Sequence, residues 1–337
     1  MTDVDQSDRR GRLRSIKLQA LVRDHLGRAL DASPGAFPPG AALIDADQAW
    51  VLVEDQPERG LGPALAWAVR NGAGGLHVLA ERSTGLLARR AAGFRLPITV
   101  WHVEERTLLP AVAEPPIVPP PADPAHLELV DTIIAGGAVP VVEHGVVTGE
   151  VRGLEVCRVV DDAATGAVRL EVGVGAHDRE AFTIIHGDVP TVEALAGVVQ
   201  AVIAHRSVDA PLHPLNHLAP ERLLRWRLEQ DPALLDLVTL TPSQPPVPRP
   251  NVKDRVPCTA IGRREDGSRV LVVCSVGVDL DLVPYAVDAR LTTLSEDGGP
   301  GAVGETWLVA PPRDLVPMTA ELAALADQAL SLVPFSG

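Results

Sequence analysis

Residues 61–103, with the sequence LGPALAWAVRNGAGGLHVLAERSTGLLARRAAGFRLPITVWHV, alternate between helix and strand patterns. The order is helix 61–70, strand 76–80, helix 84–92 and strand 98–103. Strands that alternate with helices are typical of a sheet that carries helices on its faces. We therefore predict an α/β fold with a mixed sheet core and flanking helices.

Two proline-rich stretches divide the chain, EPPIVPPPADP at 114–124 and PSQPPVPRP at 242–250. Proline lacks a backbone donor and favours extended polyproline II, so both stretches are predicted to be linkers or surface crossings. Two smaller strand-helix blocks are therefore expected around a middle domain. The predicted segments are a basic amphipathic helical arm (1–38), an N-terminal α/β block (39–113), a middle α/β domain (125–241) and a C-terminal β-rich block with a closing helix (251–337).

Local patterns extend this prediction into the two later blocks. In the middle domain a helix is predicted over 125–135, and turns at 144–145 and 152–153 are predicted to join strands. In the C-terminal block, Asp266-Gly267 predicts a hairpin turn between two apolar runs. The closing helix, which is rich in alanine and leucine, is predicted over 319–332.

Composition limits the compartment and the core. The 337 residues carry a formal net charge of −14, and only 3% are aromatic, so the core is expected to consist of Val, Leu, Ile and Ala. The chain has no run of about 18 apolar residues, which predicts no membrane span. Its start is charged and lacks a secretory signal pattern. The three cysteines (Cys157, Cys258, Cys274) show no paired spacing, which is typical of the reducing cytoplasm.

Several enzyme classes are disfavoured by missing motifs. Lys17 and Lys253 are the only lysines, and no Gly-Lys-Ser/Thr tripeptide is present for a nucleotide-binding P-loop. The sequence also lacks Gly-x-Ser-x-Gly, His-Glu-x-x-His and Cys-x-x-Cys. Residues 299–304 match Gly-x-Gly-x-x-Gly but precede a strand instead of opening a helix, so we reject them as a cofactor loop.

The N-terminal arm is locally basic in an acidic protein. Over residues 9–30, Leu18, Val22 and Leu26 recur at helical spacing, which predicts an amphipathic helix. Its predicted nucleic-acid-binding residues are Arg9, Arg10, Arg12, Arg14 and Lys17. The alternatives are an acidic partner surface, or a docking helix whose basic face is simply solvated.

Acidic residues follow or occupy several predicted strands. Asp45, Glu54 and Glu81 each end a strand, and they are expected either to gather at one sheet edge or to solvate loops. Within 154–160, strict alternation places Glu155 on one face with Cys157 and Val159, where an unpaired carboxylate costs several kcal/mol.

Glu150, Glu155 and Glu171 form the candidate catalytic set. If the strands around Glu155 and Glu171 are neighbours, these side chains meet, with Glu150 close by. Converging carboxylates repel unless a cation neutralises them, so Glu155 and Glu171 are predicted ligands for Mg²⁺ or Mn²⁺. The alternative is a solvated sheet face on which arginines pair with the acids; these arginines are Arg152, Arg158, Arg169 and Arg179.

In order and spacing, residues 125–206 resemble the PD-(D/E)XK nuclease superfamily. The resemblance implies that Glu128 lies on the preceding helix and that Glu155 and Glu171 are the two acids of the motif. Gly173 stands where the family has its lysine, and arginine cannot act as a base. The chain is therefore either a catalytically silent relative or an accidental match.

Histidines suggest a competing site. His213 and His217 have i, i+4 spacing that Glu221 continues, and on one helix these three side chains would suit zinc. Pro214 and Pro220 oppose a continuous helix, so the alternative is a turn before a helix that begins near Pro220.

Together these patterns predict a cytoplasmic, non-enzymatic scaffold or interaction protein that binds a protein partner or itself. The alternative is a metal-dependent or catalytically degenerate nuclease-like protein, and only that alternative calls for Mg²⁺ or Mn²⁺. The net charge disfavours nucleic acid as a partner, and no membrane contact is expected.

Overall fold

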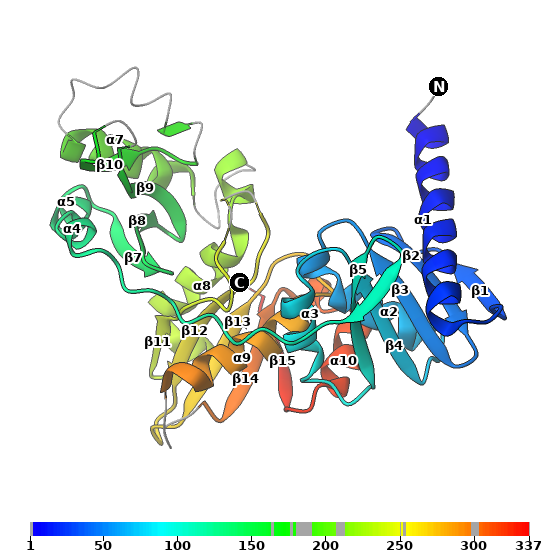
Figure 1. The fold of residues 1–337 in the computed structure, drawn as a ribbon. Helices are drawn as coiled ribbons and strands as arrows, with labels where there is room; N and C mark the ends of the chain where they lie inside the picture. Colours follow the sequence, from blue (N-terminus) through cyan, green and yellow to red (C-terminus); the bar gives the residue numbers. More distant parts are fainter. Residues whose placement is uncertain are drawn as a thin grey trace. The chain divides into compact units, whose positions relative to one another are not determined.

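The computed structural model describes residues 3–162, 165–175, 178–179, 191–206, 213–249, 251, 254–297 and 303–336. The protein is mixed α/β, with sheets of six, four and five strands and flanking helices (Figure 1), which confirms the predicted fold class. The chain divides into two compact units. Unit 1 comprises Met1–Pro116, Val278–Leu291 and Leu315–Leu332, and unit 2 comprises Ile117–Gly277, Thr292–Asp314 and Val333–Gly337.

The sheet of unit 1 has the strand order β1-β2-β3-β4-β5-β6. Its strands are β1 (Ala32–Gly35), β2 (Gly40–Asp45), β3 (Gln48–Val53), β4 (Gly75–Ala80), β5 (Ile98–Glu104) and β6 (Thr107–Pro110). The central strands β3, β4 and β5 run parallel, and the outer strands pair antiparallel. Parallel neighbours need crossover connections, which α2 (Leu61–Arg70) and α3 (Thr84–Ala91) supply. The helices and strands predicted within 61–103 are thus all present.

Helix α1 (Asp3–Leu26) packs on this sheet through one apolar stripe. Leu18, Leu21 and Val22 are buried in a cluster with Trp50 of β3 and Leu79 of β4. The helix begins before the predicted span and ends four residues before its predicted end at residue 30, since the chain turns at a glycine with positive φ after Leu26. In Figure 1 the first turns of α1 extend past the edge of the sheet.

Segments from late in the chain complete unit 1. They belong to α9 (Leu282–Asp297), which the sequence did not predict, and α10 (Pro317–Leu325). Gly62 at the start of α2 lies against the residues before α9, so closely that a Cβ there would lie 2.0 Å from the Leu280 carbonyl oxygen. Asp281 Oδ1 accepts a hydrogen bond from the Gly62 amide at 3.1 Å and thereby caps α2.

The predicted closing helix over 319–332 is wrong in its second half. Helix α10 ends at Leu325, and the chain continues into β15 (Leu330–Pro334). Ala326 pairs with Phe94 as an isolated antiparallel bridge, and the Arg95 amide donates to the Leu325 carbonyl at 2.9 Å. These long-range hydrogen bonds use backbone groups that a continued helix would need.

The first sheet of unit 2 is antiparallel, in the order β10-β9-β8-β7. Its elements are α4 (Pro124–Leu127), α5 (Val130–Ala135), β7 (Val139–Glu143), β8 (Val146–Val151), β9 (Leu154–Asp161), β10 (Val168–Val172) and α7 (Thr191–His205). The predicted single helix over 125–135 is two short ones, because the Leu129 amide bonds three residues back, to His126. The predicted turns are present, and φ is positive at all four turn residues, as two-residue hairpins require. α5 and α7 pack on the apolar face.

The second sheet of unit 2 has the order β11-β12-β13-β14-β15. Its other elements are β11 (Thr239–Pro242), β12 (Cys258–Arg263), β13 (Arg269–Cys274), β14 (Glu305–Ala310) and the covering helix α8 (Pro220–Gln230). The Asp266-Gly267 turn joins β12 to β13, as predicted, with Gly267 at φ +81°. The described 3-10 helices are Pro57–Arg59, Pro214–His217, Pro232–Leu235 and Pro312–Asp314.

Candidate functional site: a buried arginine–carboxylate network

The register of the four-stranded sheet brings the predicted acids together. Glu150 of β8 lies directly opposite Glu155 of β9, and Glu171 of β10 lies opposite Arg158. The β8–β9 pairing shifts between Gly149 and Glu150, so β9 has one residue more than β8 at that point. This bulge breaks the strict alternation that we predicted for β9. Because of it, Glu155 reaches Arg158, three residues on, which regular pleating would put on the opposite face.

Glu155 is held by guanidinium groups. Its side chain is almost fully buried, and Arg158 donates to both carboxylate oxygens at 2.9 Å. Arg179 donates to Oε1, also at 2.9 Å, and a guanidinium nitrogen of Arg249 lies 3.6 Å from Oε2. The bond to Glu155 raises the pKa of Arg158. The oxygens that would bind a cation therefore already accept hydrogen bonds.

Glu150 has a similar environment but different partners. It is 5% exposed; Arg222 of α8 donates to one oxygen, and Arg225 Nη2 lies 3.5 Å from the other. Burial alone would raise the pKa of this carboxyl, but the charges of the surrounding arginines outweigh burial and lower it. Arg222 also donates to Glu143, so α8 is tied to two strands of the sheet.

Glu171 joins the network at its rim. Arg169 Nη2 donates to Oε1 at 2.8 Å, and Arg179 Nε lies 3.4 Å from Oε2. Arg179 thus bridges Glu171 and Glu155. Glu150 does not share that arginine, since it pairs with Arg222 and Arg225. Arginine is thus the species in contact with each of the three predicted catalytic acids. Over the described residues, no group of three or more His, Cys, Asp or Glu side chains is arranged to hold a metal ion.

The five predicted nucleic-acid-binding residues of the arm fall into two groups. Arg14 donates to Glu54 and Asp55 at 2.8 and 2.9 Å, and Lys17 Nζ donates to Glu54 and Glu81 at 2.9 and 2.7 Å. Partial burial would raise the pKa of Glu54, but Lys17 and Arg14 lower it. The three remaining arm residues, Arg9, Arg10 and Arg12, are exposed.

Two of the three strand-end acids gather, which is one of the two arrangements that the sequence left open. Glu54 and Glu81 follow the parallel strands β3 and β4 and meet at Lys17. Asp45 does not join them, because β2 runs antiparallel to β3 and ends at the opposite edge of the sheet. There Arg28 donates to Asp45.

The histidine site has the geometry of the alternative, a turn. Residues 214–217 form a 3-10 turn, and His213 Nδ1 accepts from the Leu215 amide at 3.3 Å. His213, His217 and Glu221 therefore do not share one helix: α8 begins at Pro220, where the alternative expects it to begin. His177, His186 and Lys253 lie outside the described residues.

Two polar clusters in unit 1 were not predicted. Trp50 stacks on His77 with ring centroids 3.8 Å apart, and Trp101 Nε1 donates to His77 Nδ1 at 3.1 Å. Burial, together with the charge of His25, lowers the pKa of His77 to about 4. In the second cluster, Arg89 and Arg90 bind the fully buried carboxylate of Asp288 at 2.7 to 3.1 Å.

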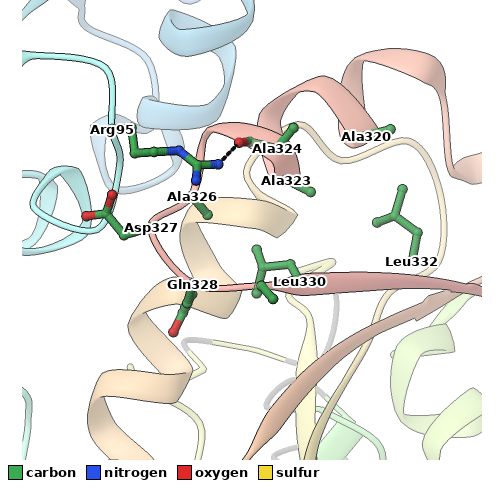
Figure 2. Close-up of a pocket in the computed structure, with 10 residues that line it drawn as sticks. Arg95, Ala320, Ala323, Ala324, Ala326, Asp327, Gln328, Leu330 and Leu332 are labelled. Atoms are coloured by element: carbon green, nitrogen blue, oxygen red, sulfur yellow. Dashed lines mark hydrogen bonds between the residues drawn. The ribbon is translucent and has the colours of Figure 1, made fainter.

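A pocket of about 490 Å³ lies beside α10 in unit 1 (Figure 2). Its lining is mainly alanine and leucine, with Arg95, Asp327 and Gln328 as polar groups. Arg95 donates to the Ala324 carbonyl, which is one of the last carbonyls of α10. The guanidinium therefore caps a helix end.

Comparisons of the chain with protein-family models, curated proteins and solved structures found no match. In the described parts of the chain, no helix is both long enough and apolar enough to cross a membrane. Fold and site together define a mixed α/β protein whose polar interior is built from arginine–carboxylate pairs.

Proposed function

We propose that this chain is a non-enzymatic scaffold or interaction protein of the cytoplasm, and that it self-associates through α1. The observation that carries the proposal is the exposure of two large apolar side chains on α1. Leu13 is 58% exposed and Ile16 is 63% exposed. At 100° per residue, both lie roughly opposite Leu18, which is buried against the sheet. The helix thus has a second apolar face.

A groove borders this second face. It has a volume of about 1120 Å³ and lies between α1 and residues 34–41. Ile16, Phe37 and Pro38 contribute apolar surface to it, and Arg10 and Arg12 contribute positive charge. Neither of these two arginines has a hydrogen bond or ion pair with any other described residue. A partner segment for this groove therefore needs apolar side chains and negative charge.

A second copy of α1 has both properties. The sequence of α1 starts acidic, with Asp3, Asp5 and Asp8, and becomes basic from Arg9 to Lys17. Two such helices side by side in antiparallel orientation place the acidic start of one against the basic stretch of the other. A two-fold axis makes the same contact twice, as in most homodimers. Parallel pairing would instead oppose like charges.

Light scattering on the full chain, coupled to gel filtration, tests this proposal. We expect a mass twice the 35.6 kDa of one chain, and a weaker dimer at high salt because exposed charges are screened. Leu13→Glu combined with Ile16→Glu is expected to give a monomer. The matched control is Val278→Glu, since Val278 is 59% exposed and lies outside α1. A wild-type monomer, or a dimer that survives the double substitution, overturns the proposal.

A metal-dependent or degenerate nuclease is the second candidate. It is favoured by one observation, the convergence of Glu150, Glu155 and Glu171 on one sheet. It requires a cation to displace guanidinium groups that are already in contact with these acids. Mg²⁺-dependent cleavage of DNA or RNA that disappears in Glu155→Ala and Glu171→Ala would establish this candidate. A nucleic-acid role for the arm would be supported if the chain binds nucleic acid, if that binding weakens with salt, and if Arg10→Glu abolishes it.

A further inference from the structure

We propose that Cys258 and Cys274 form a reversible intramolecular disulfide when the protein meets a peroxide or a small disulfide oxidant. This inference is independent of the proposed self-association. Both residues lie in the second sheet of unit 2, Cys258 at the start of β12 and Cys274 at the end of β13. They are 16 positions apart in the sequence, a spacing that matches no common cysteine motif.

The strand register places the two thiols together. Cys258 and Cys274 are directly opposite partners in the antiparallel β12–β13 pair, so both side chains point to the same face. Opposed residues of such a pair have Cα atoms about 4.5 or 5.5 Å apart, and a disulfide bridges Cα separations of about 4.4–6.8 Å. Both cysteines are free, and both are buried in one apolar cluster. The backbone spacing of this pair is therefore within the range that a disulfide bridges.

Burial distinguishes the two sulfurs. Cys258 is 3% exposed, whereas Cys274 has no exposed surface. Contact with Cys258 and burial raise the pKa of the Cys274 thiol. Cys258 is therefore the sulfur that an oxidant reaches first, and Cys274 is the thiol that closes the bond.

The reaction with hydrogen peroxide balances in two steps. The Cys258 thiolate attacks one peroxide oxygen and the O–O bond breaks, which gives a sulfenic acid and a hydroxide that is protonated to water. The Cys274 sulfur then attacks the Cys258 sulfur and expels the second hydroxide, which takes up the Cys274 proton. Two thiols are oxidised to one disulfide, and one peroxide is reduced to two waters. Thiol reductants reverse the bond by exchange.

Cys157 is a matched control within the same chain. It is also free and buried, and burial raises its pKa to about 12. The residues opposite it on the neighbouring strands are Gly149 and Val172, so no cysteine lies across from it. Cys157 should therefore stay reduced under conditions that oxidise the other two.

The test is a count of free thiols by alkylation and mass spectrometry after the folded, reduced chain is treated with hydrogen peroxide or oxidised glutathione. We expect wild type and Cys157→Ala each to lose two alkylation sites and two hydrogen atoms, and to regain both after reduction. Cys258→Ser and Cys274→Ser should lose no alkylation sites to an intramolecular disulfide. The oxidised wild type should also unfold at a higher temperature than the reduced form, a shift that both serine variants lack.

Three outcomes overturn the proposal. The first is a folded wild type that keeps all three thiols in excess oxidant. The second is a disulfide that includes Cys157, and the third is a bond found only between chains. Peptide mapping without reduction separates the last two outcomes from the Cys258–Cys274 bond.

Discussion

Replacing Glu155 by glutamine is expected to lower the free energy of unfolding of unit 2 by about 3 kcal/mol. Removing one partner of a buried ion pair costs about 3–5 kcal/mol, because the other charge is left without compensation. The lower end applies here: the Arg158 side chain is 31% exposed and retains some hydration, and Arg179 keeps its contact with Glu171. For a unit of this size, that loss corresponds to a fall in melting temperature of about 6–12 °C.

Urea unfolding followed by circular dichroism measures this loss. Glu128→Gln is the matched control, because Glu128 is an exposed acid in the same unit and is the helix acid that the nuclease resemblance implies. We expect its midpoint to equal that of wild type. Both titrations are repeated with Mg²⁺ and with a chelator, and neither addition is expected to change the wild-type midpoint.

Two results would refute the structural role of Glu155. One is a Glu155→Gln variant as stable as wild type, which would mean that the arginines do not depend on this carboxylate. The other is stabilisation by Mg²⁺ of the wild-type protein but not of the Glu155→Gln variant. A ligand that binds only the native state raises its stability, so this result would mean that Glu155 takes part in binding Mg²⁺. That second result would move Glu155 from a structural ion pair to a cation site.

Three further predictions concern unit 1. The unfolded state takes up a proton on His77 near pH 6.5, whereas the native state does so only near pH 4, so the free energy of unfolding is expected to fall as the pH drops through this window. The loss is at most about 3 kcal/mol, and nearer 1–2 kcal/mol because the ring is partly exposed; His77→Phe should reduce this loss in acid titrations. Gly62→Ala should destabilise the unit by several kcal/mol in thermal unfolding, because the added Cβ would lie 2.0 Å from the Leu280 carbonyl oxygen. The control is Gly11→Ala on α1, where nothing lies within 4 Å of an added Cβ; it should be neutral or stabilising, and equal effects of the two substitutions would contradict this account. Lys17→Met should cost less than about 1 kcal/mol in urea unfolding, since its ion pairs are partly exposed, and a larger loss would show that the arm is held more tightly than surface pairing allows.

The helices and strands predicted within 61–103 are all present because their signals are local. A glycine-containing turn ends α2, and the short apolar run of β4 forms a strand that is buried on both faces. The prediction failed at 319–332, where alanine and leucine suit a helix but backbone pairing with residues 93–95 ends it. Such pairing joins segments more than two hundred residues apart, which sequence periodicity does not show.

The acidic site was predicted in part, because strand spacing is also a local signal. Spacing on neighbouring strands was enough to bring Glu155 and Glu171 into one network, and the arginine alternative named Arg158, Arg169 and Arg179, which contact them. The bulge in β9 depends on register and was not predicted. The partners from α8, above all Arg222, come from some seventy residues further along the chain.

The cysteine pair shows a different limit. The spacing of Cys258 and Cys274 matches no motif that would have linked them. The predicted Asp-Gly turn, however, fixes the register of their two strands and so places the two cysteines opposite each other. Once the turn position is known, counting outward from it along both strands finds the pair. That counting is the sequence signal that would have revealed it.

The way unit 1 is assembled has a consequence for biosynthesis. Arg89 and Arg90 emerge from the ribosome nearly two hundred residues before Asp281 and Asp288, the carboxylates that neutralise them. Until then, the early part of the chain holds a sheet whose helix α2 has no cap and whose two buried cations have no aspartate partners. At translation rates of roughly 5–20 residues per second, this interval lasts on the order of ten seconds or more. Chaperone engagement and degradation of stalled chains should therefore concentrate in that window, and nascent chains halted before residue 281 should be protease-sensitive where completed ones resist.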